Sequence, residues 1–276
     1  MSSLFAGEKV FDDSNIAELV GSNGVVMAGG EPRYLTSKPR PTAYGSAGMP
    51  TFDAGGFTAF SESEIIRRAT ILQDKYQRIS DSITWKPKDQ NGTPLCWSFG
   101  SCGACEVSRV QGGMPYESLS PASCAGPITG YSLRGGYGEE FLKQAKETGI
   151  ASSKLWPDYS FKGGHSLRTP EVEESYENHK ILTVYDCRSN DLLQLWTMLV
   201  LGKPCPLGLD WWGHLVFACD VVVERGIIVG TRFRNSWGDW EAKNVHGVSG
   251  FGVLSPAKSR GDCYAVVEMT SYAQAG

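Results

Sequence analysis

The spacing of apolar residues separates a helical part of the chain from a strand-rich part that follows it. In several segments between residues 61 and 201, apolar side chains recur at three- and four-residue steps, as in helices that bury one face. This pattern predicts helices over residues 61–79, 96–111, 139–147 and 191–201. Denser apolar runs predict strands over residues 215–223, 226–233, 250–254 and 264–269. Helices followed by strands indicate an α+β chain with two lobes.

The first 80 residues are predicted to form an extension. Residues 21–60 contain eight Gly and four Pro, which disfavour long regular elements. Ser61 and Glu64 then form a capping-box pattern at the start of the helix over 61–79. We therefore divide the chain into an extension over 1–80, made of a Gly/Pro-rich arm and this helix, and a main domain over 81–276.

Cys96 stands at a predicted helix start, where a reactive thiol is favoured. The loop before it contains Gly92 and Pro94, and the apolar residues Trp97 and Phe99 follow it. An ordinary cysteine, with a pKa of about 8.5, is mostly protonated at neutral pH, but a helix N-terminus and a neighbouring base lower that pKa. Most free cysteines are buried packing residues. Cys96 therefore needs a base beside it to act as a nucleophile.

Two strand ends supply a base and a residue that could orient it. His214 precedes the predicted strand 215–223, and Asn235 follows the predicted strand 226–233. If these strands are adjacent, the two side chains meet, and an Asn oxygen bound to one imidazole nitrogen leaves the other nitrogen for a thiol. A lone His at a strand start is usually structural. Together, however, the three residues favour a Cys–His–Asn catalytic set.

The three segments resemble the papain and cathepsin family of cysteine peptidases. In that family a Gln lies six residues before the nucleophilic Cys, a Trp follows the Cys, and an aromatic residue stands three positions after it. The residues that match these positions are Gln90, Cys96, Trp97 and Phe99. The resemblance covers residues 82–256. It implies a papain-like α+β fold, in which a helical lobe with the nucleophile helix faces a β-barrel-like lobe across a cleft.

The resemblance also implies a role for each matched residue. Cys96 would be the nucleophile, His214 the base, and Asn235 the residue that orients the imidazole. Gln90 and the backbone N–H of Cys96 would form the oxyanion hole. The residues implied to line the substrate site are Trp97, Gly135, Gly136 and Trp237, the last of which would also shield the His–Asn hydrogen bond. The chemistry implied requires no metal or organic cofactor.

A rival register places the nucleophile at Cys105, because residues 100–105 read Gly-Ser-Cys-Gly-Ala-Cys, close to the family's Gly-Ser-Cys-Gly-Ser-Cys string, which ends at the nucleophile. Cys105 is followed by Glu106 instead of Trp, and Phe99 instead of Gln lies six residues before it. The Cys96 register is therefore preferred. As a C-x-x-C pair, Cys102 and Cys105 have no second pair beside them, so we interpret them as packing residues.

Three departures from the family bear on function. Secreted members bridge two positions that are here Thr93 and, approximately, Leu133, so both partners are missing. The segment between Leu207 and His214 is short, so the family's subsite preferences are not expected to carry over. The extension also lacks the long charged helices typical of family propeptides.

Composition excludes several partners and locations. The net charge of −4 and the pI near 5.7 give no basic footprint for nucleic acid. The sequence has no apolar run of the roughly 18 residues that a membrane span needs, and no secretory signal pattern at its start. We therefore expect a cytoplasmic or virion-associated protein with reduced cysteines.

The sequence leaves three functions open. The first is hydrolysis of peptide or protein substrates through a Cys96 acyl-enzyme. The second is a structural or assembly component, for example of a virus or phage particle, that carries an active or vestigial papain-like domain and contacts other subunits through residues 1–60. In the third, residues 1–80 act as an inhibitory pro-segment that is cleaved near residue 80.

Overall fold

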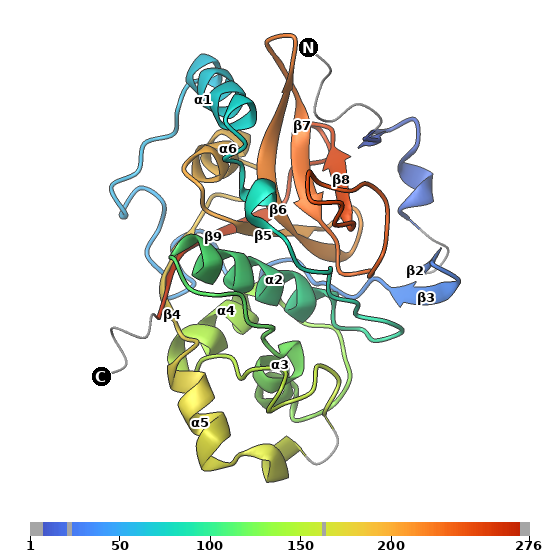
Figure 1. Cartoon of the computed structure of the whole chain (residues 1–276), viewed down its shortest axis with the longest axis vertical. Coiled ribbons are helices and arrows are strands. Elements are labelled where there is room, and N and C mark those ends of the chain that lie inside the picture. The colour runs from blue at the N-terminus through green and yellow to red at the C-terminus, as the bar shows by residue number, and fades with distance from the viewer. Residues whose placement is uncertain (1–7, 21–23, 162–163, 271–276) are drawn as a thin grey trace.

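The computed structural model of the 276-residue chain describes residues 8–20, 24–161 and 164–270. Figure 1 shows a lobe of helices below and a lobe built on a large sheet above, with helix α2 between them. The helical lobe contains α3 (Pro121–Thr129), α4 (Gly138–Glu147), η3 (Gly164–Leu167) and α5 (Pro170–Glu177). The mixed α+β fold with two lobes, predicted from the sequence, is confirmed.

The sheet lobe is built from seven strands in the order β1-β8-β7-β6-β5-β9-β4. These strands are β1 (Val10–Phe11), β4 (Ile181–Asp186), β5 (Cys205–Leu209), β6 (His214–Glu224), β7 (Ile227–Arg234), β8 (Phe251–Leu254) and β9 (Asp262–Met269). All neighbours are antiparallel except β1, which runs parallel to β8. Because β1 and β4 end the order without pairing to each other, the described strands form an open sheet and not the barrel-like closure that the resemblance implied.

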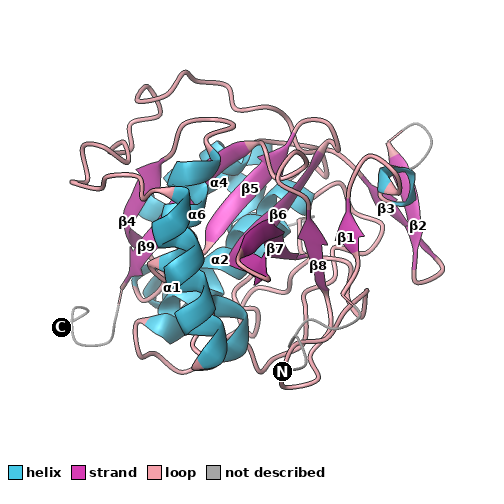
Figure 2. Cartoon of the chain, turned by 90° about the horizontal axis from the view of Figure 1, so that it is seen from above, coloured by secondary structure: helices cyan, strands magenta, loops and turns pink. Residues whose placement is uncertain are grey.

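The extension contributes to this same lobe. It contains β1, η1 (Ile16–Glu18), the hairpin β2 (Val25–Ala28) and β3 (Glu31–Tyr34), and α1 (Glu62–Asp74). Helices α1 and α6 (Leu192–Val200) pack against each other and against β6 (Figure 2). Phe11, Phe52 and Ile65 are fully buried in the core that the main domain also forms. The described parts of the extension up to Asp74 therefore share a hydrophobic core with the rest of the described chain.

One predicted helix ends earlier than the apolar spacing indicated. Helix α1 begins after Ser61, whose hydroxyl accepts from the Glu64 N–H, and ends at Asp74 instead of residue 79. Tyr76 adopts a positive φ of 54°, which an α-helix does not accommodate. The chain then turns into η2 (Ile79–Ser82), where Ile79 is buried. The apolar stripe of the sequence thus serves two elements that meet at a turn.

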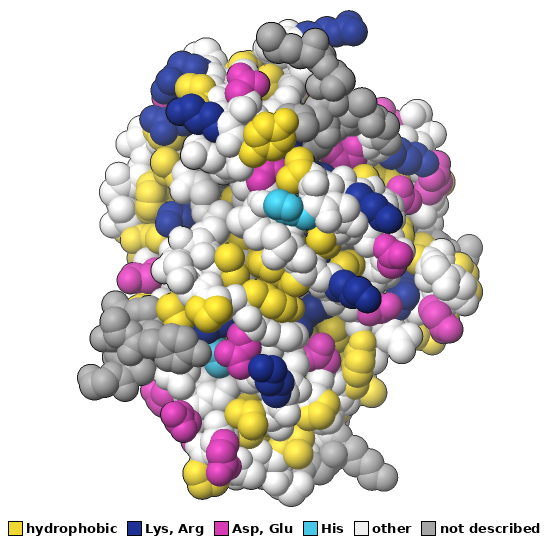
Figure 3. All heavy atoms as spheres, viewed as in Figure 1, with side chains coloured by type: hydrophobic (Ala, Val, Ile, Leu, Met, Phe, Trp, Pro, Cys, Tyr) yellow, Lys and Arg dark blue, Asp and Glu magenta, His cyan; other side chains and the backbone are white. Residues whose placement is uncertain are grey.

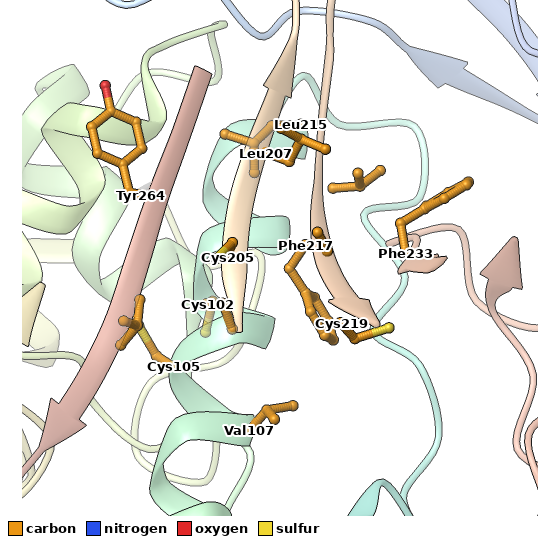
Figure 4. Close-up of a cluster of buried hydrophobic side chains, with 14 of the residues drawn as sticks. Cys102, Cys105, Val107, Cys205, Leu207, Leu215, Phe217, Cys219, Phe233 and Tyr264 are labelled. Carbon is orange, nitrogen blue, oxygen red and sulfur yellow. The ribbon is translucent and has the colours of Figure 1, made fainter. Parts of the chain in front are cut away.

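Helix α2 (Cys96–Gln111) packs closely on the sheet, and this contact sets the geometry between the lobes. A Cβ at Gly100 would lie 2.6 Å from the Leu215 side chain and 2.8 Å from the Leu215 carbonyl oxygen, and one at Gly103 would lie 2.8 Å from the Phe217 ring. Figure 4 shows Leu215 and Phe217 beside α2 in the buried cluster. Glycine inside a helix costs roughly 1 kcal/mol relative to alanine. Here it lets the start of α2 approach the start of β6.

A buried ion pair fixes α2 to the loop that precedes it. Lys88 Nζ lies 3.0 Å from Glu106 Oε1 and 3.5 Å from Asp158 Oδ2, and donates to the Ser118 hydroxyl at 2.9 Å. Glu106 also accepts the backbone N–H of Leu119 at 2.8 Å. Both side chains of the Lys88–Glu106 pair are less than one-tenth exposed. Each charge therefore depends on the other for compensation.

We expect Glu106→Ala to destabilise the protein by roughly 3–5 kcal/mol, because it leaves Lys88 buried with a weaker partner. The matched control is Glu64→Ala, which removes a carboxylate from an exposed cluster with Arg67 and Arg68. Exposed pairs of this kind contribute little. Urea unfolding of the two variants measures the difference, and equal midpoints would contradict the expectation.

No helix in the described ranges is both long enough and apolar enough to cross a membrane. On the face drawn in Figure 3, acidic, basic and apolar side chains are interspersed over both lobes.

Candidate active site

Cys96 is the first residue of α2, as the sequence predicted. Pro94 and the non-helical Leu95 precede it, so its backbone N–H lies in the first turn and has no acceptor within the helix. The positive end of the helix dipole favours a negatively charged sulfur at this place. The residue is fully buried.

His214 and Asn235 come together because β6 and β7 are antiparallel neighbours. Phe217 pairs with Arg234, so the start of β6 and the residue just after β7 lie at the same end of the pair. His214 Nε2 lies 2.8 Å from Asn235 Oδ1. This oxygen also accepts the backbone N–H of Ser236 at 2.8 Å. Because Oδ1 can only accept, the hydrogen of the imidazole is placed on Nε2, which leaves Nδ1 as the basic nitrogen.

Two tryptophans enclose the imidazole. The ring centroid of Trp212 lies 4.6 Å from that of His214, and the ring centroid of Trp237 lies 5.1 Å from it. Both tryptophans are almost completely buried, and His214 is fully buried. Trp237 is where the resemblance implied a shield for the His–Asn hydrogen bond. Trp212 was not among the predicted site residues, although its place two residues before His214 was visible in the sequence.

The imidazole lowers the pKa of the Cys96 thiol. Burial alone would raise this pKa, but the nearby His214, with smaller contributions from backbone groups of Thr36 and Leu215, lowers it to about 7. Nδ1 of His214 has no partner at ordinary hydrogen-bond distance among the described residues. The thiol and the imidazole are nonetheless close enough for His214, through its charge and its hydrogen-bonding to the thiol, to offset the effect of burial on the Cys96 pKa.

The other seven cysteines are also free thiols and are all buried. For the rival pair, burial raises the pKa of both Cys102 and Cys105. Cys102 Sγ donates to the Leu119 carbonyl oxygen at 3.2 Å. These two thiols are held in the un-ionised form that packing residues have, so Cys96 is the only one of the three with a lowered pKa.

Gln90, six residues before Cys96 in the sequence, is held in one orientation by its hydrogen bonds. Its Oε1 accepts from the Ser236 hydroxyl at 2.9 Å, and its backbone N–H donates to the Ser236 carbonyl oxygen at 2.8 Å. One consequence is that the side-chain NH₂ faces the other way. It donates to the Thr93 carbonyl oxygen at 3.1 Å and to the Tyr34 carbonyl oxygen at 3.2 Å. The side-chain NH₂ of Gln90, which the resemblance assigned to the oxyanion hole, is therefore bound to the Tyr34 carbonyl oxygen of the extension.

Residues 33–40 of the extension, which we call the strap, cover the site. The strap begins with Arg33, whose guanidinium binds both carboxylate oxygens of Asp89 at 2.5 and 3.2 Å. Thr36 Oγ1 lies 3.8 Å from Cys96 Sγ. The Ser37 N–H donates to the Gly213 carbonyl oxygen at 2.9 Å. The strap therefore crosses between the nucleophile and the loop before His214, which explains why both reactive side chains are buried.

The paired glycines receive the strap backbone. Ser37 forms a parallel bridge with Gly136, and the Lys38 N–H donates to the Gly136 carbonyl oxygen at 3.0 Å. A Cβ at Gly135 would lie 2.4 Å from the Thr36 carbonyl oxygen, so only glycine permits this approach. On the other side, Gly136 rests on Trp97, whose indole is fully buried and donates to the Arg134 carbonyl oxygen at 3.3 Å. Trp97 therefore packs against Gly136 and supports the paired glycines.

The structure thus brings the eight residues named from the sequence into one region. Those around the thiol are Cys96, His214, Asn235 and Gln90, and those along the strap or the imidazole are Trp97, Gly135, Gly136 and Trp237. Sequence reasoning missed the strap. Its residues carry no periodic pattern and lie in the Gly/Pro-rich arm, so the sequence contains no signal for their place in the site.

No known family's sequence profile matches this chain, and no curated protein matches it in sequence. Solved structures do resemble it. Xylellain, a cysteine protease from Xylella fastidiosa, superposes with a TM-score of 0.59 at 16% identity, covering 86% of this chain and 95% of that one. Digestive procathepsin L2 from Tenebrio molitor gives 0.58 at 15% identity, covering 95% and 81%.

A third likeness is to digestive procathepsin L 3 from Tenebrio molitor larval midgut, with a TM-score of 0.53 and 20% identity. It covers 66% of each chain, so this chain spans just under two thirds of that protein. At these identities the likeness concerns the course of the backbone. With the lobes and the site geometry described above, it establishes that the chain has the papain-like fold.

Proposed function

We propose that this chain is a thiol peptidase that hydrolyses peptide bonds in peptide or protein substrates. The observation that carries the proposal is the placement of Cys96, at a helix start, beside an imidazole whose other nitrogen is held by Asn235 at 2.8 Å. A thiolate, a base and an orienting group are the parts that acyl transfer through cysteine needs. The papain-like fold supports this reading.

The reaction would follow from these positions. The Cys96 thiolate attacks the substrate carbonyl carbon, and the resulting oxyanion is stabilised by the Cys96 N–H and the Gln90 side-chain NH₂. His214 gives its proton to the leaving amine as the C–N bond breaks, which leaves an acyl group on Cys96. Water then attacks the thioester and passes a proton to His214, and the thiolate departs from the released acid.

The proposal includes a latent state, because the strap lies where a substrate would bind. The Tyr34 carbonyl oxygen accepts from the Gln90 side-chain NH₂, and the Thr36 hydroxyl lies against the Cys96 thiol. A cut near residue 80, the boundary predicted from the sequence, falls at the fully buried Ser80, whose hydroxyl accepts from Arg232 Nη1 at 2.6 Å. Residues 43, 45, 46 and 48 are exposed and would be reached more easily. Activation would require the strap to swing out or to be cut on that side.

A second candidate is the assembly component expected from the sequence. What favours it is that the site is closed by a segment anchored on both sides: β1 adds to the sheet before the strap, and the Phe52 N–H donates to the Asp186 carbonyl oxygen after it. In this case the fold would serve a cytoplasmic or virion structure through residues 1–60, and where the papain-like domain is vestigial Cys96 would show no enhanced reactivity.

Labelling of Cys96 by an epoxide-type thiol reagent, followed by mass spectrometry, separates the two candidates. For the peptidase, the labelling rate should rise with pH around pH 7, because the lowered pKa of the thiol gives thiolate there. In His214→Ala the pKa rises, so labelling at pH 7 should fall roughly 15- to 50-fold, the change in thiolate fraction for a thiol returning to its ordinary pKa.

His246→Ala is the matched control, since His246 binds the Asp81 carbonyl oxygen through Nε2 and does not contact the site. Its labelling profile should equal that of the wild type. If His214→Ala leaves the profile unchanged, the peptidase proposal is wrong and the assembly candidate is favoured.

A further inference from the structure

A small pocket adjoins the proposed active site beyond the paired glycines. It is lined by Gly138, Glu139, Gly208, Leu215, Asp262 and Tyr264, with Ser37, Lys38 and Arg40 of the strap across its mouth. Leu215 follows the proposed base, and Gly138 lies two residues after the glycine that pairs with Ser37. A side chain projecting from a peptide that took the place of Ser37 would therefore enter this pocket.

The charged residues that the main domain contributes to the pocket lining are two carboxylates, Glu139 and Asp262. Glu139 is buried, and its Oε2 accepts from the Thr42 hydroxyl at 2.6 Å and from the Tyr264 hydroxyl at 3.2 Å. Asp262 is also buried. Burial raises the pKa of the neighbouring Asp210, and the negative charge of Asp262 raises it further. The main domain compensates Glu139 with Lys143, whose Nζ lies 2.6 Å from Glu139 Oε1.

The extension supplies the remaining compensation. Arg40 donates its backbone N–H to Asp262 Oδ2 at 2.8 Å, and its guanidinium binds Asp186 Oδ1 at 2.6 Å. The same guanidinium lies 5.2 Å from the Tyr264 ring centroid and donates to the Cys187 carbonyl oxygen at 3.1 Å. Asp186 is fully buried. When the strap leaves, Asp186 and Asp262 each lose a donor, and Glu139 loses Thr42.

We propose that this pocket selects a basic side chain, arginine above lysine, of the peptide substrate. This inference rests on the proposed function. The carboxylates would recover in the substrate the cation that they lose with Arg40, and the Tyr264 ring would again stack on a planar guanidinium. Arg40 thus shows, within the chain itself, which chemistry the acidic pocket accommodates. Asp262 keeps the Ser189 hydroxyl and Glu139 keeps Lys143. An apolar side chain, however, would not replace the donors that Arg40 gives to Asp262 and Asp186, and the loss of a donor by a buried carboxylate is costly.

A competition experiment on the full chain tests this. Equimolar dipeptidyl epoxide probes, identical except for Arg, Lys, citrulline or Leu at the side chain that would enter the pocket, are offered together at low concentration. Mass spectrometry then gives the ratio of the adducts on Cys96. Since every probe waits for the same opening of the strap, the ratio reports the pocket alone. We expect at least about tenfold more Arg than Leu adduct, the effect of one charge-assisted hydrogen bond.

Citrulline, which keeps the shape of arginine without its charge, should label several-fold less than arginine. Asp262→Asn should reduce the Arg:Leu ratio towards one, whereas Glu224→Gln, at the exposed end of β6, should leave it unchanged. A Leu preference in the wild type, or an Arg preference unaffected by Asp262→Asn, would overturn the inference.

Two further outcomes separate this inference from the proposed function. If iodoacetamide reaches Cys96 but no dipeptidyl probe does, the pocket does not receive peptide side chains and the inference is wrong. If the adduct ratio favours arginine but the labelling rate does not depend on His214, the pocket preference stands and the peptidase proposal fails.

Discussion

Replacing Arg33 by alanine will increase the rate at which a peptide-sized thiol reagent labels Cys96, by roughly five- to thirtyfold. Arg33 is buried and makes two charge-assisted bonds to Asp89, which is itself about 41% exposed. A hydrogen bond to a charged group contributes about 1.5–3 kcal/mol to stability. Because Asp89 is partly exposed to solvent, we expect the loss of the Arg33 side chain to cost the closed strap only about 1–2 kcal/mol. Because the rate depends on the population of the opened strap, this cost translates directly into faster labelling.

Two further variants make this result specific. Arg33→Lys keeps the charge but loses the paired geometry, so an intermediate rate is expected. Lys38→Ala is the matched control on the same strap, because Lys38 is exposed, its side chain lies 5.2 Å from the Tyr137 ring centroid, and its backbone N–H bond to Gly136 is kept. Its labelling rate should stay within about twofold of the wild type. Equal rates for Arg33→Ala and Lys38→Ala would show that the strap does not limit access to the thiol.

The second large effect is expected at the nucleophile and the oxyanion donor. In the strap-loosened Arg33→Ala protein, a further Cys96→Ala change should abolish hydrolysis of a fluorogenic peptide that carries arginine. Gln90→Ala should lower kcat by about 10²–10³, the usual effect of removing one oxyanion donor. The reason is that the Gln90 NH₂, released from the Tyr34 carbonyl oxygen, would be free to bind the oxyanion.

Gln90 also binds Ser236, so its role must be separated from a structural one. If Gln90 acts on the oxyanion, kcat falls in Gln90→Ala while the midpoint of the pH dependence of Cys96 labelling stays near pH 7. A shift of that pH profile in Gln90→Ala would mean that the variant has disturbed the thiol and imidazole instead. Retained hydrolysis in Cys96→Ala would refute the assignment of the nucleophile.

Local signals determined a large part of the fold in advance. The helix over 96–111 was predicted with the bounds that α2 has, because glycine and proline precede it and glycines follow it. Strands β6 and β7 were predicted within one residue at most of their ends. The short helices α3 and α5 were not predicted, since α3 contains Pro127 and neither is long enough to show a repeating apolar stripe.

The residues of the candidate site also fall into two groups: those that the sequence indicated and those that only the fold brings to the site. Cys96, His214, Asn235 and Gln90 could be named because each lies at a helix start, at a strand end or at a fixed spacing along the chain. Trp212 lies only two residues before His214, so its contact with the imidazole was within reach of sequence reasoning. Nothing local indicated the strap or the Arg40–Asp186 pair, because Thr36 lies 60 positions from Cys96 and Arg40 lies 146 positions from Asp186.

The sequence by itself indicated the side chains that we propose for the chemistry and the elements that present them, because helix and strand periods and their end residues act over a few positions. Only the tertiary structure decided whether the thiol is accessible and what charge surrounds the neighbouring pocket. Both depend on where the extension packs against the main domain, and the energy of that packing comes from long-range burial and ion pairs that leave no periodic trace along the chain.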